Sequence, residues 1–160
     1  MEKLQQVLKI LKGKTIGLLG LTFKPNTDDM RDAPSLDLIA NLTRLGAKVK
    51  AYDPIISEKD LHSSFANINL TNNPLEVARD CDALVLVTDW QIFSAIDYQK
   101  IAKLMITPII IDGRNFLNPQ TLEQAGFYYV GIGRPSTGDI GIATKIFSKT
   151  VSKLEDLQPI

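Results

Sequence analysis

The 160-residue sequence has one cysteine and one histidine, and its 18 basic and 18 acidic side chains sum to zero formal charge. With Cys81 alone, neither an intrachain disulfide nor a cysteine-rich zinc motif can form. His62 has no second histidine or cysteine at ligand spacing, so we expect no metal site. Without a broad positive field, neither nucleic acid nor an anionic membrane is an expected partner.

Long hydrophobic runs are also missing. No stretch approaches the ~20 apolar residues that cross a bilayer, and the N-terminus lacks the apolar core of a secretory signal. We therefore expect a cytoplasmic protein in a reducing compartment, which agrees with the scarcity of cysteine. The composition, 44% hydrophobic and 22% charged, is typical of one globular domain with a single core.

Short apolar runs alternate with amphipathic stretches along the chain. This alternation predicts an α/β fold of the Rossmann-like kind, a doubly wound, mostly parallel sheet with helices on both faces. The expected strands are residues 15–19, 49–52, 68–70, 83–87 (central), 109–111 and 128–130. The expected helices are residues 2–12, 35–45 with Ser35 as N-cap, 74–78, 92–104 and 119–125.

A long polar loop, residues 20–35, follows the first strand and leads into a helix. In open α/β sheets, ligands bind at the carboxyl ends of such strands, and a connection of this length favours a functional role. Gly17 and Gly20 are only part of a dinucleotide fingerprint, because the third glycine is missing. The loop is therefore not built to hold a pyrophosphate on its helix in the usual way.

Three cations follow predicted strands: Lys24 and Arg31 in the long loop, and Arg114 after residues 109–111. At strand ends they are suited to bind phosphate oxygens, and arginine does so through two parallel hydrogen bonds. The alternative is a set of structural salt bridges, for which neighbouring carboxylates are available (Asp28, Asp29, Asp32 and Asp112).

The loop has the sequence Gly-Leu-Thr-Phe-Lys-Pro-Asn-Thr-Asp-Asp-Met-Arg-Asp-Ala-Pro-Ser. This sequence resembles the opening of the C-terminal domain of the UDP-glucose/GDP-mannose dehydrogenase family. The resemblance continues through Ala51–Pro54, Val87–Trp90 and Ile111–Asn115, and covers residues 13–134. It implies the nucleotide-sugar-binding domain of an NAD-dependent 6-dehydrogenase of the UDP-glucose type. That enzyme oxidises the sugar C6 alcohol to a carboxylate, and we expect this chain alone to be inactive.

The resemblance also implies roles for individual residues. Phe23, Lys24 and Arg114 would contact the nucleotide-sugar, and a UDP-sugar is the expected ligand. Arg31 would reach NAD, which binds mainly to a missing N-terminal domain. For Phe23, the alternative is a side chain that fills the core beside the first strand.

The family forms its thioester intermediate on a cysteine, but Cys81 lacks the glycine-rich surroundings of that thiol. We therefore expect a buried structural cysteine and no catalytic residue in this chain. Asp53 closes the second strand, where Pro54 favours a simple turn. Trp90 and Phe93 are expected to pack an interface with other domains.

The expected division of the chain is a connecting helix at 1–12, a nucleotide-sugar-binding domain at 13–134 and a C-terminal tail at 135–160. The expected partners are the missing N-terminal and central domains and further copies of the chain in a homo-oligomer. Without its upstream region, the first helix should leave an apolar stripe partly uncovered (Leu4, Val7, Leu8 and Leu11).

Two alternatives stay open from the sequence. The chain could be a stand-alone module that binds a nucleotide-sugar without catalysis, or an NAD-binding domain of a different dehydrogenase. The incomplete glycine fingerprint argues against the second of these.

Overall fold

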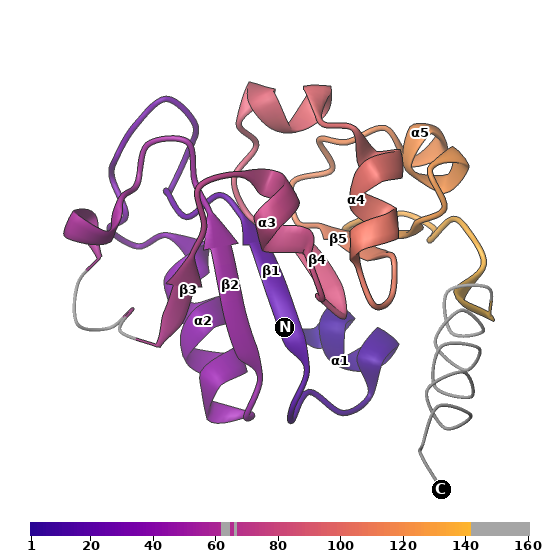
Figure 1. Cartoon of the computed structure of the whole chain (residues 1–160), viewed down its shortest axis with the longest axis horizontal. Coiled ribbons are helices and arrows are strands. Elements are labelled where there is room, and N and C mark those ends of the chain that lie inside the picture. The colour runs from indigo at the N-terminus through magenta and orange to yellow at the C-terminus, as the bar shows by residue number, and fades with distance from the viewer. Residues whose placement is uncertain (62–64, 66, 142–160) are drawn as a thin grey trace, which may run out of the picture.

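The computed structural model describes residues 1–61, 65 and 67–141, so His62 and most of the predicted tail lie outside the described residues. Six strands form one all-parallel sheet in the order β3-β2-β1-β4-β5-β6 (Figure 1). Helices cover both faces of this sheet, which confirms the predicted doubly wound, Rossmann-like α/β fold.

The elements follow the predicted order. The strands are β1 Thr15–Leu19, β2 Lys48–Tyr52, β3 Ile68–Leu70, β4 Ala83–Leu86, β5 Ile109–Asp112 and β6 Tyr128–Val130. The α-helices are α1 Glu2–Leu8, α2 Pro34–Arg44, α3 Pro74–Ala78, α4 Tyr98–Leu104 and α5 Pro119–Gln124, and the 3-10 helices are η1 Glu58–Asp60 and η3 Gln91–Ala95.

The two middle strands, β1 and β4, are buried except for Thr15 at the start of β1. They pair in register from Ile16 opposite Ala83 to Leu19 opposite Leu86. Both read as continuous apolar runs because helices cover both of their faces. The predicted central position of the fourth strand is therefore confirmed.

Each face of the sheet has its own hydrophobic core. On one face, α1 and α2 contribute Leu4 and Ile39 to a cluster with Leu18 and Val85. On the other face, α3, α4 and α5 pack against the alternate strand residues (core residues Val77, Ile101, Leu122, Leu19 and Leu86).

The first helix is shorter than predicted, and its apolar stripe is covered only in part. It ends at Leu8, because Lys9 has a positive φ of 62°, which no helical residue adopts. Leu4 and Leu11 are only 1% and 4% exposed, since α1 folds back against the sheet and contributes to the first core. Two residues of the expected stripe, Leu4 and Leu11, are therefore covered by the chain's own sheet, while Val7 and Leu8 stay partly exposed.

Two other predicted helices differ at their ends. The stretch 92–104 is divided into η3 and α4, because the side chain of Asp97 accepts a hydrogen bond from Lys100 N (3.1 Å) and starts a new helix. Ser35 is not an N-cap, because α2 begins one residue earlier, after Ala33. Its hydroxyl instead donates to the carbonyl of Leu21 across the loop (2.6 Å).

The aromatic residues after β4 belong to the core of this chain. Phe93 is fully buried and Trp90 is 7% exposed. The ring of Phe93 packs edge to face against Tyr52, with 6.1 Å between centroids. The prediction that Trp90 and Phe93 form an interface with other domains is therefore wrong.

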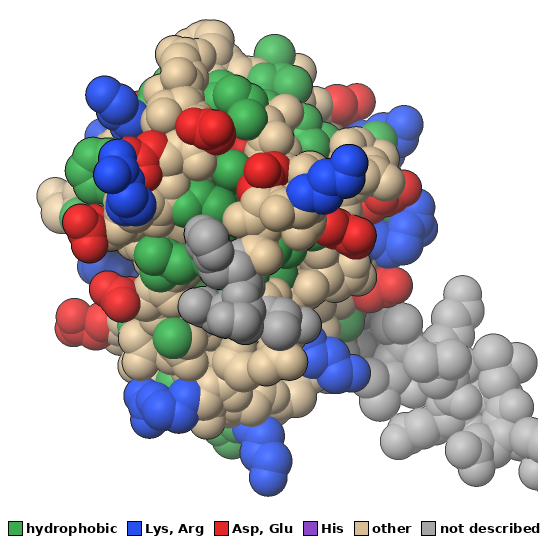
Figure 2. Space-filling view, turned by 90° about the vertical axis from the view of Figure 1, so that its left-hand side faces the viewer, with side chains coloured by type: hydrophobic (Ala, Val, Ile, Leu, Met, Phe, Trp, Pro, Cys, Tyr) green, Lys and Arg blue, Asp and Glu red, His purple; other side chains and the backbone are tan. Residues whose placement is uncertain are grey.

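The surface carries charges of both signs. Figure 2 shows acidic and basic side chains interspersed over most of the face beside β3. Within residues 1–61, 65 and 67–141, no helix combines the length and the apolar character that a bilayer span requires.

We expect Leu4→Ala to lower the free energy of unfolding by about 2–3 kcal/mol, because it removes buried contacts between α1 and the sheet. Urea denaturation followed by circular dichroism measures this loss. Ile10→Ala is the matched control, since Ile10 is 69% exposed and should change stability by less than ~0.5 kcal/mol. Equal effects of the two substitutions would show that α1 does not pack as described.

Candidate functional site

The long loop after β1 is fixed at its base by a buried carboxylate. Asp53, directly after β2, is 5% exposed, and its Oδ2 accepts a hydrogen bond from Leu21 N (2.8 Å). Its Oδ1 accepts from Ile55 N (2.9 Å) and Ile56 N (3.1 Å). Asp53 thus does more than form the predicted turn, because it joins the loop after β1 to the loop after β2.

Two buried hydroxyls hold the same stretch of backbone. Ser35 donates to the carbonyl of Leu21 and Thr88 donates to the carbonyl of Thr22, both at 2.6 Å. Gly20 is required beside them, since its φ is +88° and a Cβ would lie 2.5 Å from the Cβ of Thr88. The loop therefore leaves the sheet in one defined direction.

Arg114 connects three loops at the carboxyl edge of the sheet. Its Nε donates to Val87 O at 2.9 Å, and its Nη2 donates to Phe23 O at 3.0 Å. Among the described residues, no ion pair joins it to Asp112. For Arg114, the alternative of a structural salt bridge is thus not seen among these residues, and Nη1 has no hydrogen bond to a described residue.

Phe23 and Lys24 lie on the exposed part of the long loop. Phe23 is 48% exposed, so the alternative in which it fills the core is wrong. Lys24 is exposed as well, and no hydrogen bond or ion pair joins its ammonium to another described residue. Arg114 donates to the carbonyl of Phe23, the residue before Lys24. The structure therefore brings Lys24 and Arg114 to the same part of the carboxyl edge of the sheet.

Arg31 folds back on its own loop. Its Nε and Nη2 bind the two carboxylate oxygens of Asp29 at 3.0 and 2.8 Å. These hydrogen bonds lower the pKa of Asp29 to about 2 and raise the pKa of Arg31. For Arg31, the structure therefore shows the salt bridge that the sequence left as an alternative.

Asp112 at the end of β5 organises the loop that carries Arg114. It is fully buried, and its Oδ1 accepts from Arg114 N (3.1 Å). Its Oδ2 accepts from Leu117 N (2.8 Å) and from the hydroxyl of Tyr129 (2.9 Å). Sequence reasoning missed Tyr129, because nothing local links it to a carboxylate 17 residues earlier.

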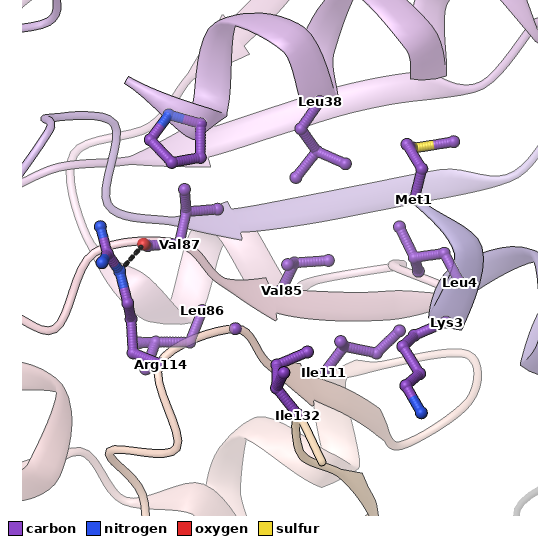
Figure 3. A pocket seen from close by; sticks show the side chains of 12 residues that line it. Met1, Lys3, Leu4, Leu38, Val85, Leu86, Val87, Ile111, Arg114 and Ile132 are labelled. Atoms are coloured by element: carbon purple, nitrogen blue, oxygen red, sulfur yellow. Dashed lines mark hydrogen bonds between the residues drawn. The ribbon is translucent and has the colours of Figure 1, made fainter. Parts of the chain in front are cut away.

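An apolar cavity of about 270 Å³ lies beside Arg114, over the ends of β4 and β5. Figure 3 shows the guanidinium of Arg114 at one end and the first helix at the other, with Leu38 and Ile132 on opposite sides. Val85 and Ile111 lie between these two sides. Arg114 thus lies at one end of an apolar cavity.

Cys81 lies at the opposite end of the sheet, before β4. Its thiol is buried and donates to the carbonyl of Val77 (2.9 Å). Burial raises its pKa to about 12, so the reactive thiolate is disfavoured. In the part of the chain that the structure describes, no three His, Cys, Asp or Glu side chains are placed to hold a metal ion.

The chain is similar to known proteins of one family. Residues 17–119 match the sequence model of the UDP binding domain of the UDP-glucose/GDP-mannose dehydrogenase family. UDP-glucose 6-dehydrogenase of Pseudomonas aeruginosa is 43% identical over 132 residues, which are 79% of this chain and 29% of that enzyme. UDP-glucose 6-dehydrogenase TuaD of Bacillus subtilis is 39% identical over 146 residues, which are 91% of this chain and 32% of that enzyme.

A solved structure agrees with these relatives. NDP-N-acetyl-D-galactosaminuronic acid dehydrogenase from Methanosarcina mazei Go1 superimposes with a TM-score of 0.69 at 29% identity. The match covers 83% of this chain and 27% of that protein. The chain therefore spans less than a third of the length of each of these similar proteins.

We expect Cys81 to resist alkylation by iodoacetamide at pH 8 in the folded protein. The pKa of Cys81 is raised to about 12 in the folded protein, so the thiol stays protonated at pH 8. Its pKa in the unfolded chain is ~8.5, so deprotonation favours unfolding as the pH rises above that value. Mass spectrometry should show modification at least ~100-fold slower than in urea. Modification at the rate of a free thiol would contradict the buried, protonated state.

Proposed function

The chain belongs to the UDP-glucose/GDP-mannose dehydrogenase family, and from this premise we propose that it is the nucleotide-sugar-binding part of an NAD-dependent UDP-glucose-type 6-dehydrogenase. The complete enzyme would oxidise the C6 alcohol of the sugar to a carboxylate, with NAD as hydride acceptor. NAD would bind mainly to upstream domains, and this chain would contribute to binding and orienting the nucleotide-sugar.

The position of Arg114 is the observation that carries this proposal. Two of its donors are used on backbone carbonyls, so the guanidinium is held where it can present Nη1 to a ligand. A diphosphate supplies the acceptor oxygens that such a group binds strongly. The adjoining apolar cavity offers a surface for a less polar part of the same ligand.

Lys24 and Phe23 complete the proposed site. The exposed ammonium of Lys24, which has no ion pair with any described residue, follows directly after Phe23 and adds positive charge for a phosphate. The half-exposed ring of Phe23 provides an apolar contact beside it. Arg31 is assigned to NAD on the family resemblance alone, and in the structure it forms an exposed ion pair with Asp29.

The loop after β1 argues against an NAD-binding domain of another dehydrogenase. In such domains, the acid after the second strand binds the ribose of the cofactor. Here both oxygens of Asp53 already accept hydrogen bonds from three backbone N–H groups. With the glycine fingerprint also incomplete, a nucleotide-sugar is the ligand that these residues fit better.

We expect Lys24→Ala and Arg114→Ala each to weaken binding of UDP-glucose by about 1.5–3 kcal/mol, because each removes a charge-assisted hydrogen bond to phosphate. Arg31→Ala should change the affinity less than twofold. Titration calorimetry on the 160-residue chain measures these affinities, and circular dichroism confirms folding.

Arg31→Ala serves as the control for Lys24→Ala and Arg114→Ala, because it also removes a loop cation. Arg114→Ala also removes the bonds to the loop carbonyls, so Arg114→Lys is included to keep the charge while losing the paired donors. Its affinity should fall between those of wild type and Arg114→Ala. Loss of binding in Arg31→Ala alone, with the other variants unaffected, would contradict the assigned roles.

We also expect the chain alone to reduce no NAD with any nucleotide-sugar, because Cys81 is buried and protonated and no other cysteine is present. The absorbance of the reduced cofactor, followed for hours at high protein concentration, provides the test. A turnover that disappears in Cys81→Ala would contradict this expectation.

A further inference from the structure

We propose that Tyr129 is a positioning residue for nucleotide-sugar binding, which acts through Asp112 to place Arg114. The inference rests on the proposed function, in that Arg114 is taken to bind the diphosphate. Tyr129 itself is fully buried, so it acts only through its neighbours.

The first step is the bond between two buried side chains. The Tyr129 hydroxyl donates to Asp112 Oδ2 at 2.9 Å, and both residues are 0% exposed. The same oxygen accepts from Leu117 N at 2.8 Å. A buried carboxylate needs such donors, because an unpaired charge away from water is costly. Tyr129 therefore fixes the orientation of the Asp112 carboxylate.

The second step runs from the carboxylate to the arginine. Asp112 Oδ1 accepts from Arg114 N at 3.1 Å, while no ion pair between the two side chains exists among the described residues. Asp112 thus sets where the backbone of Arg114 lies. The arginine side chain then extends to Val87 O and Phe23 O, across the edge of the sheet.

Together these contacts form one continuous path from β6 to the loop after β1. Removal of the Tyr129 hydroxyl leaves Asp112 Oδ2 with a single donor, so the carboxylate and the backbone bonded to it lose a defined position. A phenylalanine ring fills the same space, so the core should stay packed. The effect should therefore appear at Arg114 rather than in the fold as a whole.

The test compares Tyr129→Phe with Tyr128→Phe, using UDP as the probe in titration calorimetry on the 160-residue chain. Tyr128 is the next residue of β6 and packs against the core of the other face. We expect about 5- to 20-fold weaker UDP binding for Tyr129→Phe and less than a twofold change for Tyr128→Phe. In an Arg114→Ala background, Tyr129→Phe should cause no further loss. A full additional loss in that background, or no loss in wild type, would overturn the proposal.

A second measurement decides the proposal without any ligand. By NMR hydrogen exchange, Arg114 N–H and Leu117 N–H should exchange at least ~10-fold faster in Tyr129→Phe, while Leu18 N–H in the central strand is unchanged. Unaltered exchange at Arg114 and Leu117 would overturn the proposal. If the wild-type chain binds no UDP, the proposed function of the isolated chain fails, and hydrogen exchange still decides the role of Tyr129.

Discussion

The candidate site depends on the bond between the buried carboxylate of Asp53 and the backbone N–H of Leu21. A carboxylate that is 5% exposed is tolerated only with donors around it, and three backbone N–H groups supply them. This requirement ties the loop after β1 to the loop after β2. The hydroxyls of Ser35 and Thr88 then fix the carbonyl side of the same backbone, so the long loop has a rigid base despite its polar sequence.

Arg114 shows how one side chain combines a structural and a proposed binding role. Its Nε and Nη2 join three loops through hydrogen bonds to backbone carbonyls, and its Nη1 has no hydrogen bond to a described residue. An arginine in a structural salt bridge has its charge neutralised by a carboxylate and is less available to a ligand. The structural hydrogen bonds of Arg114 go to neutral backbone carbonyls instead. No carboxylate of residues 1–61, 65 and 67–141 forms an ion pair with this guanidinium, which suits a site for an anionic ligand.

The errors of the sequence analysis share a cause. The apolar spacing in residues 2–12 indicates a helix face that is buried against another surface. The aromatic residues Trp90 and Phe93 indicate the same for the segment after β4. Which surface covers them depends on how the helices pack, and here the sheet of the same chain does so. Ser35 departs from the expected N-cap for a related reason, since its hydroxyl donates to the carbonyl of Leu21, 14 residues earlier, rather than to its own helix. A local pattern identifies an apolar face or a hydroxyl, but not its partner.

The sequence by itself determined the order of the strands and helices, the parallel sheet and the three loop cations. These follow from short apolar runs and from turn residues, which act over a few positions. Only the tertiary structure decided that Arg114 bonds a carbonyl 91 residues away and that Tyr129 holds Asp112. It also decided that Arg31 turns back to Asp29, while Lys24 forms no ion pair within the part of the chain that the structure describes. The physical reason is that the strand order β2-β1-β4-β5-β6 brings distant strand ends to one edge, where buried polar groups find the donors and acceptors that burial requires.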